Sequence, residues 1–330
     1  MVVLPQTDKS VPASAAARML PFPPASATPV DDYVFLLGRP PIAEFLGFVR
    51  NMAADGPSAE QGPLTEQWRA ANDRVRALEA AEGGLADNPE TFPLPDEAAA
   101  LADQVRTDPM FSSSYRFVPS EFVMVDLDRL VVFQKFINLG YVAALEASLP
   151  AQPTVEDMAR LAFGVDRRNA PVRTMQNAQN AFSFISSSND LRFLDAKLVQ
   201  VGPGDKLPCG GRAVARVMLT VGFGSNYLNA ISVQGRLVLN NGSHRAYALR
   251  DLGVRYAPCI VQRVTRAEEL ELITGGDLQQ SPERYLSTPR PPMLKDYFDP
   301  ALRATVAVPR KNRLVTLKFG CEQSDVPATA

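Results

Sequence analysis

One short stretch of this chain collects the residue types that could bind or transform a ligand. Residues 240–253 read NNGSHRAYALRDLG and contain His244, the only histidine among 330 residues, directly before Arg245. An apolar run that predicts a strand precedes the stretch, and apolar residues at helical spacing follow. The start of a helix leaves backbone N–H groups unpaired and carries positive partial charge. A strand–turn–helix corner of this kind therefore predicts a phosphate-binding site.

Each residue of the corner could contribute to anion binding in a different way. Gly242 permits the turn and lets the backbone approach a ligand without a Cβ in between. Asn241 or Ser243 can cap the helix, and Arg245 can bind phosphate oxygens in bidentate fashion. Positive potential at the helix start disfavours the charged form of His244, so we expect a neutral imidazole that contacts a ligand. The alternative is a histidine that only supports the turn.

The same stretch resembles a known superfamily. Residues 235–264, GRLVLNNGSHRAYALRDLGVRYAPCIVQRV, are similar to the ParB/sulfiredoxin-like superfamily, whose hallmark is a strand followed by Gly-x-(His/Arg)-Arg-x-x-Ala. Gly242, His244, Arg245 and Ala248 match this pattern position by position. The resemblance implies a nucleotide phosphate site that takes ATP, ADP or CTP with Mg²⁺.

An upstream block, residues 117–149, resembles the first strand and turn of that superfamily, with Gln134 at its polar corner. Two departures from the superfamily pattern exclude some of the activities found among its members. Ser243 stands where sulfiredoxins require cysteine, which argues against sulfinic-acid reduction. The proline-rich segment after residue 275 offers no helix-turn-helix, so sequence-specific DNA binding is not expected.

Phosphoryl transfer needs a base for the acceptor and carboxylates for magnesium. Asp126 and Asp128 share the polar side of the alternating segment VMVDLD, and together with His244 they are the candidate catalytic residues. No protein cluster is expected to hold the metal, because the nucleotide would carry Mg²⁺ with Asp126 as a further ligand. The alternative is that these carboxylates only form a solvated face.

Composition excludes several other kinds of function. One histidine and three scattered cysteines cannot form a typical zinc site. A net charge of −2 argues against a broad basic surface for DNA or anionic lipid. No apolar run approaches the roughly 18 residues that a membrane span needs, and no signal peptide is apparent. We therefore expect a cytoplasmic protein without membrane contact.

The order of periodic segments predicts an α/β (α+β) protein. We expect a disordered tail over residues 1–30 and a helical N-terminal module over 31–112. A mixed-sheet ParB/sulfiredoxin-like core would follow at 113–265, with a helical insertion at about 150–190. Residues 266–330 would form an extended C-terminal arm.

Two functional hypotheses follow. The first is a nucleotide-binding enzyme, a Mg²⁺-dependent phosphotransferase or NTPase, with Asn241, Gly242, Ser243 and His244 around the phosphates, Arg245 neutralising their charge and Gln134 facing the reacting end. The second is a non-catalytic interaction or assembly protein that keeps the fold and binds a protein partner through its N- or C-terminal extension. The long proline-rich extensions favour the second hypothesis.

Overall fold

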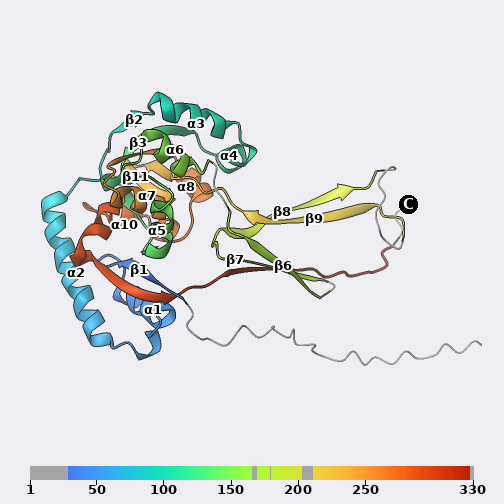
Figure 1. The fold of residues 1–330 in the computed structure, drawn as a ribbon, viewed down its shortest axis with the longest axis horizontal. Coiled ribbons are helices and arrows are strands. Elements are labelled where there is room, and N and C mark those ends of the chain that lie inside the picture. Colours follow the sequence, from blue (N-terminus) through green and yellow to red (C-terminus); the bar gives the residue numbers. More distant parts are fainter. Residues whose placement is uncertain (1–28, 166–168, 179, 203–210, 328–330) are drawn as a thin grey trace, which may run out of the picture.

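The computed structural model describes residues 29–165, 169–178, 180–202 and 211–327. Helices and strands are mixed as the sequence predicts, and the fold is α+β (Figure 1). The expected tail lies outside the described residues except for residues 29 and 30. Among the residues described, no helix combines the length and the apolar character needed to span a bilayer.

A mixed six-stranded sheet forms the centre of the molecule. Its order is β2-β3-β12-β10-β11-β4, with parallel pairing of β10 with β12 and of β11 with β4. The strands are β2 (Thr91–Pro93), β3 (Ser120–Asp126), β4 (Val131–Val132), β10 (Asn229–Val233), β11 (Arg236–Asn241) and β12 (Tyr256–Arg263). Residues 256–263 are almost wholly apolar in their buried part, as expected for a central strand.

The β10–β11 hairpin turns at Gln234 and Gly235, both of which have positive φ. That is the backbone of the tight turn that the sequence predicts here. From β11 the chain passes through Gly242 into α7 (Ser243–Asp251). The strand–turn–helix corner expected at residues 240–253 is therefore present.

A second, three-stranded sheet joins the two ends of the chain. Its order is β13-β1-β5, formed by β1 (Val30–Leu36), β5 (Phe136–Asn138) and β13 (Arg303–Pro309). Side chains from residues 34 to 308 share one hydrophobic cluster. Residues 31–112 are thus not a module with its own core, because β1 and β2 each complete a sheet with strands from distant parts of the chain.

Helices surround these sheets (Figure 1). In the described part of the chain, six α-helices precede β10: α1 (Ile42–Met52), α2 (Gln61–Glu82), α3 (Asp96–Arg106), α4 (Pro109–Ser114), α5 (Leu139–Glu146) and α6 (Val155–Phe163). Those after β12 are α8 (Ala267–Ile273), α9 (Asp277–Gln280) and α10 (Glu283–Leu286). The 3₁₀ turns are η1 (Gly56–Ser58), η2 (Leu127–Arg129), η3 (Leu294–Phe298) and η4 (Pro300–Leu302).

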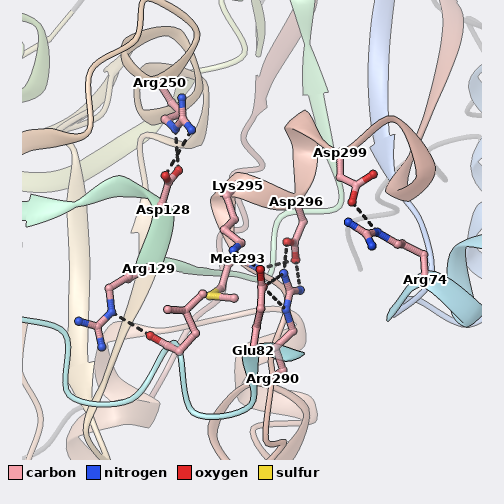
Figure 2. A network of polar contacts seen from close by, with 11 residues as sticks. Arg74, Glu82, Asp128, Arg129, Arg250, Arg290, Met293, Lys295, Asp296 and Asp299 are labelled. Atoms are coloured by element: carbon pink, nitrogen blue, oxygen red, sulfur yellow. Dashed lines mark hydrogen bonds and ion pairs between the residues drawn. The ribbon is translucent and has the colours of Figure 1, made fainter. Parts of the chain in front are cut away.

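The C-terminal segment is not the extended arm that its prolines suggested. Arg290 is 1% exposed and donates to Asp296 at 2.5 and 2.6 Å and to Glu82 of α2 at 3.0 Å. Lys295 donates to the same Glu82 at 2.7 Å, as Figure 2 shows. Tyr297 is fully buried. These ion pairs fix residues 290–299 against α2, so the segment is part of the core.

Two β structures project from the globular part (Figure 1). One is a three-stranded sheet of order β14-β7-β6, made of β6 (Val172–Ala178), β7 (Ala181–Ser186) and β14 (Arg313–Lys318). The other is a two-stranded ribbon, β8 (Leu191–Gln200) and β9 (Ala215–Phe223). The expectation of a helical insertion at about 150–190 is therefore wrong beyond α6, because residues 172–186 form the strands β6 and β7, and β7 also pairs with β14.

Candidate functional site

The start of α7 is shaped by packing against the protein itself. Gly242 has φ 88°, a left-handed conformation that favours glycine. A Cβ added to Gly242 would lie 2.9 Å from the Leu228 Cα and 3.3 Å from the Tyr227 carbonyl oxygen. The close approach that we expected toward a ligand is thus made toward the segment that enters β10.

Arg245 points into the protein. Its side chain is 3% exposed, and its guanidinium donates a hydrogen bond to the Asn226 side-chain oxygen. Asn226 in turn donates to the carboxylate of Asp190. We expected Arg245 to bind phosphate, but in the structure its guanidinium is buried and bonded to the half-buried Asn226.

His244 is a neutral hydrogen-bond acceptor. Its Nε2 accepts from the backbone N–H of Asn138 at 3.0 Å, and its ring packs edge-on against Tyr141 with centroids 5.3 Å apart. Burial and the neighbouring Arg245 lower the pKa of His244 to about 4, whereas Asp190 acts in the opposite direction. The imidazole is therefore neutral at pH 7, as expected, but burial is the main cause and the bond joins α7 to the start of α5.

The two candidate catalytic aspartates lie at the other end of α7. Asp128 accepts from Arg250, in the last turn of the helix, at 2.6 Å (Figure 2). Asp126 is 5% exposed, caps η2 through the Asp128 N–H at 3.0 Å, and accepts from Arg255 at 3.0 Å. In a helix of nine residues the two ends are about 13 Å apart. The structure therefore separates Asp126 and Asp128 from His244, and it gives each carboxylate an arginine partner.

Gln134 lies apart from the corner as well. It lines a cavity of about 170 Å³ between the Pro40–Pro41 loop and the C-terminal segment. Its Nε2 donates to the Phe136 carbonyl at 3.2 Å, and its own carbonyl accepts from Tyr297. Lys135 in the same cavity is paired with Glu44 and Asp277. Gln134 thus organises the turn between β4 and β5.

Asn241 is the corner residue that faces open space. With Asn240 it lines a cleft of about 660 Å³ at the base of the ribbon. The other walls come from residues 189–193 of the β8 strand and its approach and from residues 313–315 of β14. Arg192, Arg313 and Asp190 are among them, so the cleft is lined by two positive charges and one negative charge. Within the described part of the chain, no three His, Cys, Asp or Glu side chains come together as a metal site.

The ribbon carries a feature that the sequence analysis missed. Its strand pairs place two kinds of side chain on opposite faces, since cross-strand partners share a face. One face, called here the apolar face, has no charged residue: Leu191, Phe193, Ala196, Leu198, Gln200, Ala215, Val217, Leu219, Val221 and Phe223. All charged residues of the two strands lie on the other face, called here the charged face: Arg192, Asp195, Lys197 and Arg216.

A bulge keeps this separation in phase. The register shifts between Phe193 and Asp195, which leaves Leu194 without a partner of its own. If the strand continued regularly through Leu194, without the bulge, Asp195 and Lys197 would lie on the apolar face. The signal was present in the sequence, because each strand alternates, but both alternations had to be aligned through the bulge to reveal one charge-free face.

The apolar face is open to solvent over most of its length. Leu198 is 68% exposed, Val217 67%, Phe193 45% and Leu219 40%. Only Leu191, at the base, is fully buried. Contiguous exposed apolar surface of this kind marks an interaction site in soluble proteins.

Comparison with known proteins gives no relative for this chain. No protein-family model, no curated protein and no solved structure matches it. The resemblance to the ParB/sulfiredoxin-like superfamily therefore stays a prediction from two sequence blocks.

Proposed function

We propose that this chain is a non-catalytic interaction protein whose ribbon docks another protein surface. The observation that carries the proposal is the apolar face of β8–β9, which is free of charge and exposed along most of a ten-residue strand. A two-stranded ribbon is marginally stable in water by itself. Its two unpaired edges also offer backbone groups to a further strand. Coverage by a partner would supply both the burial and the hydrogen bonds that the free ribbon lacks.

The contacts at α7 support a structural role for the corner. His244 ties α7 to α5, Arg245 is engaged by the half-buried Asn226, and Asp126 and Asp128 hold the far end of the helix through Arg255 and Arg250. The four side chains to which the enzyme hypothesis gives the charge and the chemistry are thus used by the fold. This arrangement does not fit a triphosphate held by Arg245, with Asp126 at its magnesium ion.

The docking role is tested by matched substitutions on the two faces. Leu198→Lys with Val217→Lys adds two positive charges to the apolar face, while Thr220→Lys adds one to the opposite face. All three sites are exposed, so each variant should keep the wild-type Tm within a few degrees. Native mass spectrometry of the protein purified under native conditions should show a bound chain, of any identity, in wild type and Thr220→Lys only. An equal complement of bound chains in all three proteins would contradict the proposal.

One observation favours nucleotide binding as a second candidate function. The 660 Å³ cleft has the size of small-molecule sites, and Asn241, Arg192 and Arg313 line it beside the start of α7. ATP, ADP or CTP with Mg²⁺ would then contact Asn241 and the two arginines.

Thermal shift distinguishes the two candidates. Under the interaction hypothesis, ATP, ADP and CTP at millimolar concentration, with or without Mg²⁺, leave Tm unchanged. Ser243→Asp provides the control, because it places a carboxylate at the helix start where a phosphate would bind, and a carboxylate there suits the helix. A nucleotide-dependent rise in Tm that Ser243→Asp removes would favour nucleotide binding at the corner.

A further inference from the structure

The three-stranded sheet β14-β7-β6 has a charge-poor face of its own. Its register places Phe182, Phe184, Val315 and Leu317 together, and all four are partly exposed. The single charge on that face is Arg313, which donates to the Asn189 carbonyl at 3.1 and 3.3 Å. We call this surface the phenylalanine face. Arg173 and Lys318 lie on the opposite side of the sheet.

The chain thus carries two apolar β faces, one largely exposed on the ribbon and one half-buried on the three-stranded sheet. The ribbon and the sheet meet at their base, where Leu191, Phe193 and Val315 line the same cleft. Farther out they run as separate projections (Figure 1), and Leu198 and Val217 remain about two-thirds exposed. Two β layers with apolar faces pack at about 10 Å in a sandwich. Here the ribbon lacks such a partner over most of its length, and the phenylalanine face is only half-buried.

Area decides which association can be stable. At about 3.3 Å per residue and 4.8 Å per strand, one ribbon face projects about 300 Å², and the phenylalanine face about the same. A stable interface buries about 800 Å² on each partner. Two ribbons packed only on each other fall well short of that figure. If each partner uses both faces, the flat area doubles and the side chains add to it. The buried area then approaches about 800 Å² per partner.

From these features we infer that a second copy of this chain covers the ribbon. The apolar face of each ribbon lies on the phenylalanine face of the other copy, and a two-fold axis repeats the contact. One chain supplies both complementary surfaces, which is the requirement for an isologous dimer. Apart from Arg313, which donates to the Asn189 carbonyl, the charged residues of both layers lie on the faces that point away from this contact. The inference rests on the proposed function and names its partner.

Sedimentation velocity over a wide range of micromolar concentrations gives the first test. Wild type and Thr220→Lys should sediment as dimers, while Leu198→Lys should dissociate at least about a hundredfold more readily, because each dimer would bury two unpaired ammonium groups. A monomeric wild type at every concentration overturns the inference. The proposed function survives that result if native mass spectrometry still finds a different bound protein that Leu198→Lys and Val217→Lys remove.

Cross-linking tests which faces meet. In a background of Cys209→Ser and Cys321→Ser, with Cys259 buried, one chain carries Leu198→Cys and another Leu317→Cys. A short bismaleimide should give a dimer-sized product from the mixture of the two chains. A dimer-sized product from the Leu198→Cys chain alone would mean that two ribbons pair face to face, and it overturns the arrangement. Efficient cross-linking inside a single chain that carries both cysteines would mean that the two projections close on each other, which also overturns it.

Discussion

Because His244 is the only histidine of the chain, its effect on the pH dependence of stability can be measured separately. The folded protein keeps His244 neutral down to a pKa of about 4, whereas an unfolded histidine takes up a proton near pH 6.5. Between these values the unfolded state binds more protons, so stability rises with pH. The contribution is complete above pH 6.5 and is lost as the pH falls toward 4. We expect urea unfolding to show a loss of about 2 kcal/mol over that range after allowance for partial exposure.

His244→Gln is the matched variant for this prediction. A glutamine oxygen can still accept from the Asn138 N–H, but it does not titrate. The difference in unfolding free energy between wild type and His244→Gln should therefore shrink as the pH falls from 6.5 to 4, while carboxylates that titrate in both proteins cancel. A difference that is constant with pH would show that His244 is not held neutral.

Gly242 and Gly253 allow backbone strain to be separated from close packing. Both have positive φ, 88° and 82°, at the two ends of α7. An added Cβ meets Leu228 at 2.9 Å at the first position and nothing within 4 Å at the second. Gly253→Ala should cost about 1–2 kcal/mol from left-handed strain alone. Gly242→Ala should lower the free energy of unfolding by about 1–3 kcal/mol more, because the atom that its Cβ meets is the Leu228 Cα, a backbone atom that cannot move without a shift of the chain. Equal losses in chemical denaturation would contradict this assignment of Gly242 to packing.

At the scale of elements, the sequence correctly predicted the helices and strands whose conformation depends on nearby residues. The hairpin at Gln234–Gly235, the strand at 256–263 and the start of α7 all follow from sequence over a dozen residues. Residues 172–186 did not, because Met, Gln and Ala permit a helix there. The middle strand of their sheet, β7, pairs with Arg313–Lys318, more than 120 positions away, and single-sequence propensity contains no information on such a partner.

The candidate site divides in the same way. The sequence placed a strand, a tight turn and a helix around Gly242, because these are local features. It also predicted a neutral His244, but for the helix start, whereas the main cause is burial, which depends on the whole fold. It could not place Asp126 and Asp128, since the direction in which α7 runs from the sheet decides which end they meet. It also could not show that Arg245 turns toward Asn226, because that contact depends on how the segment before β10 packs.

At the scale of the molecule, the last two strands, β13 and β14, belong to different parts of the fold. β13 pairs along the whole of β1, and Arg310 just beyond it donates at 2.6 Å to Asp31, which is 9% exposed. That guanidinium is the main reason why the pKa of Asp31 is lowered. β14, by contrast, pairs only with β7 in the projecting sheet. The C-terminal residues therefore belong to the core up to position 310 and to the projecting sheet after it.

Two truncations test this division. A chain that ends at Lys311 loses β14 but keeps the Arg310–Asp31 pair, and its core should melt within a few degrees of wild type in circular dichroism. A chain that ends at Leu302 also loses β13 with the buried side chains of Ala304, Val306 and Val308. Each buried valine contributes about 1.5–3 kcal/mol, and Asp31 would be left without its cation. The sum approaches the 5–15 kcal/mol that holds a typical domain folded. That chain should show no cooperative unfolding, and a cooperative melt near the wild-type Tm would mean that β1 and β5 hold the sheet without β13.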